Sequence, residues 1–420
     1  MYNVSSLSNG LRVATCAMPQ MESVAVGIWV GVGGRYESKS HCGISHFLEH
    51  MVFKGTRRRS AREISEAIEG VGGYLNAFTG EENTCYYAKV TRRHLDRALD
   101  VLSDLYLHAR LDPADVARER AVIKEELAMY RDQPQHQVHE LLNQMLWPRH
   151  PLGYPVAGTP ESLDRIRRAD LIEFKRRHYV ASNTVVAVAG ACEHDDVVQR
   201  VRKWLRVPRH SAAPAFEPVR RPVRGPRLRM SRRRVEQAAL ALGVRAYSRN
   251  DPRRYALKIL SVMLGENMSS RLFQVIREER GLAYSIQTST AFLADTGALV
   301  VSAGLDPGKL QKAMRLILRE LQRIARHRPP GDELQRAKDY ALGQMWLGLE
   351  STTNQMMWIG EHVLAYGYIE EPHVIEKRIQ MLTPEEIKDV AADVFRNDNL
   401  AAAVVTPSDH EDELRAALRW

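Results

Sequence analysis

One segment near the start of the chain reads Gly43-Ile44-Ser45-His46-Phe47-Leu48-Glu49-His50-Met51-Val52-Phe53. Its apolar residues recur at the spacing of an amphipathic helix, and no helix breaker follows before Gly55. His46 and His50 are four residues apart, so a helix would place both imidazoles on one face, one turn from each other. Two imidazoles placed in this way can bind one Zn²⁺ ion, with Glu49 beside them.

The order His-x-x-Glu-His is the inverted form of the His-Glu-x-x-His zinc signature. A catalytic zinc ion keeps three protein ligands and one position for water, whose pKa falls so that a nearby carboxylate can take its proton. We therefore predict that Glu49 is the general base. The same pattern also arises by chance, and two histidines on a half-buried helix can be purely structural. Cys42 is an alternative ligand, although Gly43 should place it at or before the start of the helix.

A third ligand is expected from a later amphipathic helix that carries three glutamates. Glu119 and Glu126 are seven residues apart and share a stripe with Val122 and Ile123. Carboxylates on an apolar stripe are costly unless they pair with a cation or a metal. We predict that Glu126 is the ligand and that Glu119 orients a ligand or holds a proton. On periodicity alone, Glu125 remains a rival.

The chain has 420 residues, of which 44% are hydrophobic and 26% are charged, and a globular chain of this length should form two domains. We expect a metal-bearing catalytic domain over residues 1–207, a Pro- and Arg-rich linker over residues 208–232, and a second domain without metal over residues 233–420. The formal net charge is +9, but eight arginines fall within residues 220–234, among prolines and a glycine. This composition indicates a solvated linker and no nucleic-acid partner. Nucleic-acid binding through that linker is a rival hypothesis.

The two halves show the same order of elements. In the first half we predict helices over 44–53, 61–71, 93–109 and 114–130 and a strand over 84–90; in the second half we predict helices over 270–279, 307–326 and 332–349 and strands around 285–290 and 299–303. This repetition predicts an α+β fold of two homologous domains, each a mostly antiparallel sheet packed with helices. The second half has no His-x-x-Glu-His, and the positions opposite the two glutamates are near Arg336 and Gly343. We therefore expect one metal ion per chain.

Nothing at the start of the chain reads as a secretory signal, and the apolar run over residues 24–32 is too short to span a membrane. We expect a cytoplasmic protein without membrane insertion. The four cysteines are irregularly spaced and are expected to be reduced: Cys16, Cys42, Cys85 and Cys192.

The chain resembles the insulinase (pitrilysin) family of zinc peptidases, specifically its processing-peptidase branch, over nearly its whole length. The residues that carry the resemblance are Gly34-Arg35 and Glu37 with 43–51, Phe53-Lys54-Gly55-Thr56, Gly72-Gly73 with Asn76-Ala77, Glu119-Arg120 with Ile123, Glu126 and Leu127, and Arg277, Gly281-Leu282 and Tyr284. The resemblance implies a zinc-dependent endopeptidase that cleaves extended oligopeptides or unfolded, presequence-like segments. Some relatives have lost the metal site, so a catalytically silent scaffold is the alternative.

The resemblance also implies roles for individual residues. His46, His50 and Glu126 match the zinc ligands, Glu49 matches the base, and Glu119 matches an additional carboxylate of the motif. This favours Glu126 over its neighbour as the third ligand.

Other matched residues are implied to contact the substrate. Asn76 and Ala77 match the segment beside which a peptide lies, and Arg277 and Tyr284 match a pair that reaches the substrate and the oxyanion. The resemblance implies two halves that enclose a cavity. Because this chain carries both sets of residues, we expect a homodimer with composite active sites; one subunit of an obligate heterodimer is the alternative.

One departure concerns substrate preference. Mitochondrial processing peptidases carry acidic residues ten and fourteen positions after the third ligand, where this chain has His136 and Glu140. A neutral imidazole cannot pair with a substrate arginine as a carboxylate does, although Glu140 and Asp132 could compensate in part. The glycine-rich loop of the eukaryotic non-catalytic subunit is also shortened here, around residues 265–268. We therefore expect a bacterial-type enzyme with broader use of oligopeptides.

Overall fold

The computed structural model describes residues 2–207, 214–220, 225–409 and 411–418. The chain forms two compact units that do not follow the order of the sequence. The first unit runs up to Leu127 and adds Tyr154–Glu217 and Trp346–Glu370. The second unit contains Ala128–Gly153, Pro218–Met345 and the chain from Glu371 onward.

The first unit is built on a six-stranded sheet in the order β1-β2-β6-β3-β5-β4. Its strands are β1 (Tyr2–Ser6), β2 (Arg12–Ala17), β3 (Ser23–Val30), β4 (Tyr74–Thr79), β5 (Thr84–Thr91) and β6 (Thr184–Gly190). β2 and β6 pair in parallel, and the other neighbours are antiparallel. β4 is therefore an edge strand, with one side of its backbone unpaired by the sheet.

The second unit is built on a five-stranded sheet in the order β7-β11-β8-β10-β9. Its strands are β7 (Arg227–Arg232), β8 (Ala238–Ala246), β9 (Ala283–Phe292), β10 (Gly297–Leu305) and β11 (Leu400–Thr406). Only β7 and β11 pair in parallel. This order repeats β2-β6-β3-β5-β4 strand for strand, including the one parallel pair. The expected α+β fold of two similar halves is confirmed.

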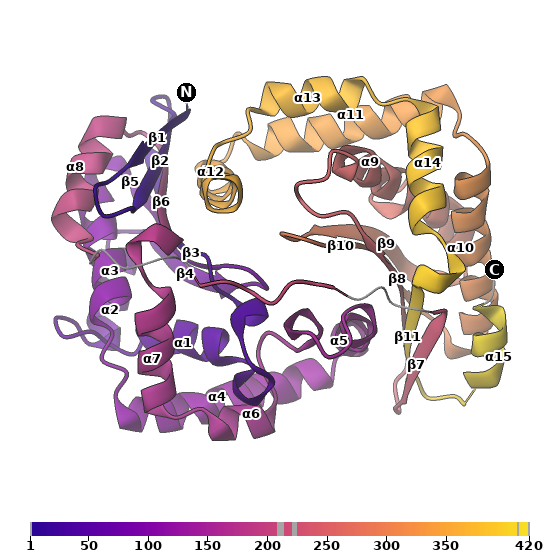
Figure 1. The fold of residues 1–420 in the computed structure, drawn as a ribbon, viewed down its shortest axis with the longest axis horizontal. Helices are drawn as coiled ribbons and strands as arrows, with labels where there is room; N and C mark the ends of the chain where they lie inside the picture. The colour runs from indigo at the N-terminus through magenta and orange to yellow at the C-terminus, as the bar shows by residue number, and fades with distance from the viewer. Residues whose placement is uncertain (1, 208–213, 221–224, 410, 419–420) are drawn as a thin grey trace. The chain divides into compact units, whose positions relative to one another are not determined.

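Helices cover both faces of the first sheet (Figure 1). The helices of this unit are α1 (Ile44–Val52), α2 (Ala61–Glu69), α3 (Leu95–His108), most of α4 (Pro113–Arg131), α6 (Pro160–Arg165), α7 (Arg168–His178), α8 (His194–Trp204) and α12 (Thr352–Tyr366). On one face, Val26 and Ile28 of β3 pack into a core that includes residues of α1, α3 and α8. On the other face, Trp29 packs with Met356 and Ile359 of α12. Because both faces are buried, β3 reads as an almost continuous apolar run.

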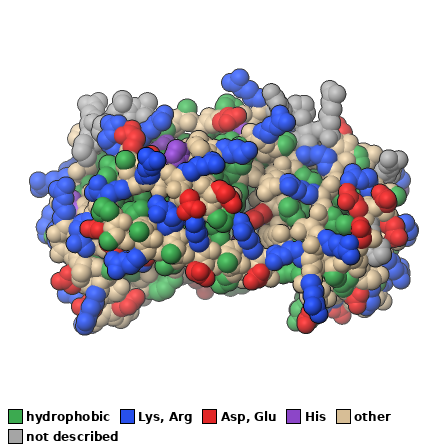
Figure 2. Space-filling view, turned by 90° about the horizontal axis from the view of Figure 1, so that it is seen from below, with side chains coloured by type: hydrophobic (Ala, Val, Ile, Leu, Met, Phe, Trp, Pro, Cys, Tyr) green, Lys and Arg blue, Asp and Glu red, His purple; other side chains and the backbone are tan. Residues whose placement is uncertain are grey.

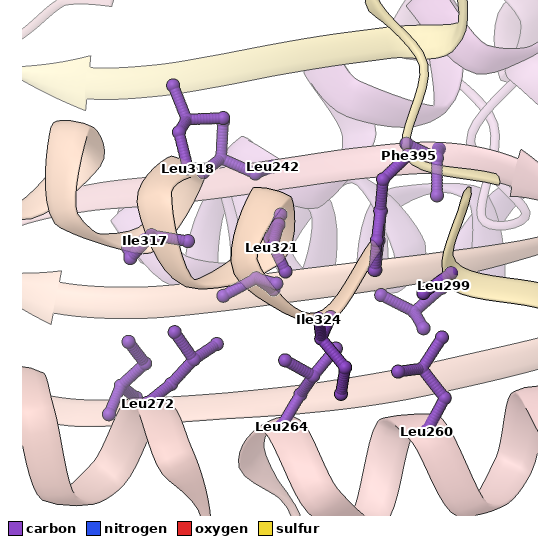
Figure 3. Close-up of a cluster of buried hydrophobic side chains, with 14 of the residues drawn as sticks. Leu242, Leu260, Leu264, Leu272, Leu299, Ile317, Leu318, Leu321, Ile324 and Phe395 are labelled. Atoms are coloured by element: carbon purple, nitrogen blue, oxygen red, sulfur yellow. The ribbon is translucent and has the colours of Figure 1, made fainter. Parts of the chain in front are cut away.

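The second sheet is covered by α5 (Pro134–Leu146), α9 (Arg254–Gly265), α10 (Leu310–Arg326), α11 (Gly331–Gly348), α13 (Pro372–Gln380), α14 (Pro384–Val394) and α15 (Glu411–Ala417). Figure 3 shows the core on one face, where Leu260 and Leu264 of α9 lie near Leu299 of the sheet and Ile324 of α10. Each such side chain, fully buried, contributes about 1.5–3 kcal/mol. The other face is covered by α5, which packs against β8 and β11.

The expected domain limits differ from these units. α5 falls within residues 1–207 but packs in the second unit, and α12 falls within residues 233–420 but packs in the first. Periodicity shows that a helix has a buried face, but it does not show which sheet that face covers.

The expected linker is also not a connector throughout. Residues 208–213 and 221–224 lie outside the described residues, but Arg227–Arg232 forms the edge strand β7. Leu228 and Met230 pack against the core, while the arginines between and beside them are tolerated at an edge. The expectation of a segment without strand was therefore wrong here.

Most predicted helices and strands agree with the structure to within a few residues, although the predicted helix at 270–279 contains a π-helix, Phe273–Glu278. The four cysteines are free, as expected. Among the described residues, none of the helices combines the length and the apolar composition needed to cross a membrane. On the face drawn in Figure 2, Lys and Arg side chains are interspersed with Asp and Glu and form no single basic patch.

Candidate metal centre

The helix α1 carries the inverted zinc motif and is fixed at its start by Gly43 and Glu37. Gly43 has a φ of 92°, and a Cβ there would lie 2.8 Å from the carbonyl oxygen of Ala157, so this position requires glycine. The Glu37 carboxylate accepts hydrogen bonds from the backbone N–H groups of Gly43 (2.6 Å) and Ser45 (2.8 Å). It satisfies two of the amides that a helix start leaves unpaired.

The buried face of α1 leaves the three motif residues at its border. The apolar side chains, together with Ser45, are buried, whereas His46, Glu49 and His50 are half-buried. Glu126 of α4 is also half-buried and approaches the same place. The two imidazoles are one turn apart, with ring centroids at 4.7 Å.

His46, His50 and Glu126 each offer one ligand atom, and these three atoms lie within 4.8 Å of one another. Oε2 of Glu126 is 3.8 Å from Nε2 of His46 and 3.5 Å from Nε2 of His50. Two atoms bound to a tetrahedral zinc ion at about 2.0–2.1 Å would be about 3.4 Å apart. The two imidazoles and one carboxylate therefore fit zinc in type and in spacing. Within the described part of the chain, no other group of His, Cys, Asp or Glu side chains has this arrangement.

His46 is kept neutral by its surroundings. Burial lowers its pKa to about 4, with a contribution from His50, and Glu126 opposes the shift only in part. Its Nδ1 atom is buried and has no hydrogen-bond partner among the described residues. A neutral imidazole is the form that can bind a metal ion.

Glu49 borders the same site, but it is not one of the three candidate ligands and contacts the strand β4 instead. Its Oε2 atom accepts a hydrogen bond of 2.5 Å from Oγ1 of Thr79 on β4. Burial raises its pKa above the ordinary value, and the bond from Thr79 opposes that shift. A carboxylate with a raised pKa beside a metal site has the properties of a general base.

Glu119 lies behind His50, on the side away from the ligand atoms. Its Oε2 atom is 3.3 Å from Nδ1 of His50, and its Oε1 atom is 2.8 Å from Nζ of Lys54. The carboxylate is buried and joins the imidazole to an ammonium group. This contact fixes the ring so that Nε2 faces Glu126, which is the orienting role expected of such a carboxylate.

One detail of the sequence interpretation changes, and neither of the two rival ligands belongs to the group. Val122 is 49% exposed, so the stripe that buries Glu119 contains Ile123 but not Val122. The Sγ atom of Cys42 donates to the carbonyl oxygen of Pro155 at 3.1 Å, and this cysteine is not part of the ligand group. Glu125 is exposed and does not belong to that group either.

The residues expected to contact substrate lie in both units. Asn76 and Ala77 are on the edge strand β4 of the first unit, where the Asn76 side chain accepts the Ala77 N–H at 2.8 Å. The remaining residues belong to the second unit.

In that unit, Nδ1 of His136 is 3.8 Å from Oε1 of Glu140, one turn along α5. The Arg277 guanidinium lies 4.8 Å from the ring centroid of Phe273 and 5.9 Å from that of Tyr284. The Tyr284 side chain is 74% exposed.

Three residues of the site had no role assigned from sequence: Lys54, Thr79 and Glu37. Lys54 is four residues after His50, so a helix would bring the two side chains close together. This spacing does not show that both contact Glu119. Thr79 carries no signal, because its contact depends on how β4 approaches α1. Glu37 precedes the helix by seven residues, outside the usual capping position.

Comparison with known proteins gives a consistent picture. Residues 12–160 match a family described as insulinase, peptidase family M16, and residues 165–340 match a family described as the peptidase M16 inactive domain. A protein of Mycobacterium leprae named an uncharacterized zinc protease is 40% identical, with 99% of this chain and 94% of that protein aligned. The zinc protease YmxG of Bacillus subtilis, also named uncharacterized, is 36% identical over 95% of this chain and 97% of its own length.

Two solved structures share the fold. A protease from Helicobacter pylori superposes with a TM-score of 0.91 at 22% identity, over 97% of this chain and 99% of its own. A peptidase M16 inactive domain from Pseudomonas fluorescens gives a TM-score of 0.90 at 17% identity, over 97% and 98%.

Proposed function

We propose that this chain, which belongs to the insulinase family of peptidases (family M16), is an active zinc endopeptidase that cleaves extended oligopeptides and unfolded segments. Zinc is the metal of this family, and the relatives are named zinc proteases. The single observation that carries the proposal is the spacing of three ligand atoms, within 4.8 Å, contributed by His46, His50 and Glu126. A scaffold that had lost catalysis would not require this ligand set together with the half-buried carboxylate of Glu49 beside it.

In this proposal the metal ion and each surrounding side chain have separate roles in catalysis. Zinc, when bound, supplies a Lewis acid that lowers the pKa of water and polarises the scissile carbonyl. Glu49 takes the proton of the attacking water at Oε and passes it to the leaving amine. Thr79 holds the Glu49 carboxylate in position, and Glu119 holds the ring of His50.

The edge strand β4 supports an extended peptide as the substrate. Ala77 has its N–H engaged only by the Asn76 side chain, so a peptide carbonyl can take over that donor when it pairs along the edge. Backbone pairing is insensitive to side-chain identity, which favours broad use of oligopeptides. His136 and Glu140 offer one carboxylate for a substrate cation instead of two, which also argues against a strict preference for arginine.

Arg277 and Tyr284 are proposed to contact the substrate and stabilise the oxyanion of the transition state. The exposed phenol and the guanidinium beside it have the chemistry that a developing negative charge requires. Tyr284→Phe should therefore reduce kcat and leave zinc content unchanged.

The central test compares the wild type with Glu49→Gln, and with Glu125→Gln as a matched control on the exposed side of α4. Bound zinc per chain and cleavage of a mixture of extended peptides are measured on the same samples. We expect about one zinc ion in all three proteins and cleavage by the wild type and the control only. Zinc without cleavage by the wild type would favour the heterodimer, and cleavage would then require a second kind of subunit. Absence of zinc would favour the scaffold.

A homodimer and a cytoplasmic location remain part of this proposal. The mass of the purified protein in solution, measured with and without peptide, tests the first; fractionation of the source cells tests the second.

A further inference from the structure

A cavity of about 520 Å³ lies on the first unit, between the end of α3 and one side of α7. Five of its twelve lining residues are basic and none is acidic: the basic ones are Arg57, Arg110, Arg168, Lys175 and Arg176. On an ordinary surface, where charges of both signs are mixed, five cations so close together would have carboxylates among them. This lining therefore differs from the interspersed charges on the face drawn in Figure 2.

Lys175 is the least expected of these residues. The residue is half-buried, and burial lowers the pKa of its ammonium group to about 8. Nζ donates to the carbonyl oxygen of Leu107 at 3.3 Å and lies 6.0 Å from the ring centroid of Tyr179. No carboxylate of the described residues pairs with it. A half-buried ammonium group without a counter-charge is costly, unless an anion is bound there for part of the time.

Three of the four neighbouring cations also have no ion-pair partner among the described residues. Arg57 and Arg110 are exposed and form no ion pair with any described residue, and Arg168 donates its Nε only to the carbonyl oxygen of Leu111, at 2.6 Å. Arg176 differs, because Glu173 neutralises it through two bonds of 2.7 and 2.9 Å. Four positive charges therefore surround one cavity.

A purely structural role accounts for only part of this charge. The cavity adjoins the C-terminal end of α3, which carries about half a negative charge and favours cations. Lys175 and Arg168 each bond one carbonyl of that region. This account does not explain Arg57 and Arg110, which carry half of the four positive charges.

We propose that this cavity binds a phosphate-bearing small molecule. Guanidinium groups bind phosphate oxygens through paired bonds, and lysine supplies a compact charge. The rest of the lining is apolar, including Leu111, Val207 and the 40% exposed side chain of Ile172. The volume lies in the range of about 300–1,000 Å³ typical of small-molecule sites. The ligand therefore combines phosphate with a less polar body, as a nucleotide does.

Calorimetric titration of the full chain tests the proposal with three probes: orthophosphate, inorganic triphosphate and adenosine triphosphate. The proteins are the wild type, Lys175→Met, Arg110→Gln, and Arg93→Gln as a control that removes an exposed arginine elsewhere on this unit. We expect one site per chain and a loss of affinity of at least about tenfold in the first two variants. Arg93→Gln should bind as the wild type does. Because triphosphate also binds zinc, the titration is repeated with His46→Gln, which should not change the affinity.

The probes separate the possible sources of phosphate. Tighter binding of the nucleotide than of triphosphate shows that the apolar wall is used, whereas equal binding shows that the site reads phosphate alone. Failure of all three probes to bind, or an equal loss in Arg93→Gln, overturns the proposal.

Folding is monitored by the unfolding temperature. Lys175→Met should unfold at or above the wild-type temperature, because it removes a half-buried charge that no described carboxylate pairs with. If it unfolds much earlier while Arg110→Gln binds like the wild type, these cations serve only to stabilise the end of α3, and the proposal is wrong. These readouts do not depend on peptidase activity.

Discussion

The hydroxyl group of Thr79 donates a 2.5 Å hydrogen bond to the Oε2 atom of Glu49, so the edge strand β4 reaches directly to the proposed base. The same strand presents the Ala77 N–H at its free edge. The element proposed to align the peptide therefore also holds the carboxylate that acts on it. We therefore expect substrate binding and proton transfer to be coupled through this strand.

Thr79→Val should reduce kcat/KM by about tenfold or more, because Glu49 loses the bond that fixes its carboxylate. Zinc content should not change, since Thr79 touches none of the ligands. Thr79→Ser retains the hydroxyl group and should restore most of the activity. Equal activity in the valine and serine variants would contradict this role. Steady-state kinetics with one defined peptide provides the measurement.

Glu119→Gln should weaken zinc binding by roughly tenfold. His50 and Lys54 are both donors to the two carboxylate oxygens, and an amide offers only one acceptor for them. Competition with a chelator of known affinity measures the effect. Glu125→Gln, on the same helix but exposed, is the matched control and should retain wild-type affinity; a similar loss in both variants would point to net charge instead of orientation.

Glu37 should make stability depend on pH. Burial raises its pKa to about 7, so the folded state binds a proton that the unfolded chain releases near pH 4.5. Stability from this group is present at low pH and is lost as the pH rises from about 4.5 to about 7. The loss amounts to roughly 3 kcal/mol.

Glu37→Gln has no such titration. Its unfolding free energy is measured by urea denaturation at several pH values. As the pH rises across this interval, the unfolding free energy of the variant should increase relative to that of the wild type. Parallel curves for the two proteins would show that the carboxyl group titrates normally in the folded state.

Substitution by alanine should change the stability of the fold in opposite directions at two glycines, which lie on helices that follow each other in the sequence. A Cβ at Gly360 of α12 would lie 2.1 Å from Nε1 of Trp29, whereas a Cβ at Gly343 of α11 would meet nothing within 4 Å. Gly360→Ala should destabilise by about 1–3 kcal/mol through overpacking. Gly343→Ala should stabilise by about 0.5–1 kcal/mol through helix propensity. Denaturant unfolding of both variants measures the pair, and stabilisation by Gly360→Ala would show that α12 is not packed as described.

Much of the site could be predicted because it depends on local spacing. The interval between His46 and His50 fixes their common face once the segment is helical. The seven-residue interval places Glu119 and Glu126 on a common side of α4, but periodicity alone left Glu125 as a rival, and the family resemblance was needed to favour Glu126. Contacts that depend on tertiary approach could not be predicted. Thr79 is an ordinary strand residue until β4 is placed beside α1.

The fold shows the same division. Helices and strands followed from hydrophobic periodicity, and the repeated order of elements predicted two similar sheets. The sequence could not predict which sheet α5 and α12 cover, because an amphipathic helix can cover any suitable apolar face. β7 was missed because its Pro- and Arg-rich surroundings resemble a connector, whereas pairing with β11 determines its conformation.

The exchange of α5 and α12 between the units has a consequence for biosynthesis. α12 is translated only after all but one strand of the second sheet, so the Trp29 face of the first sheet stays uncovered while most of the chain emerges from the ribosome. We therefore expect the nascent first half to expose apolar surface, and to be prone to aggregation, until α12 has been synthesised. For the same reason, a single cut by another protease in the connector would not release a complete half, because each fragment would retain a helix that the other requires.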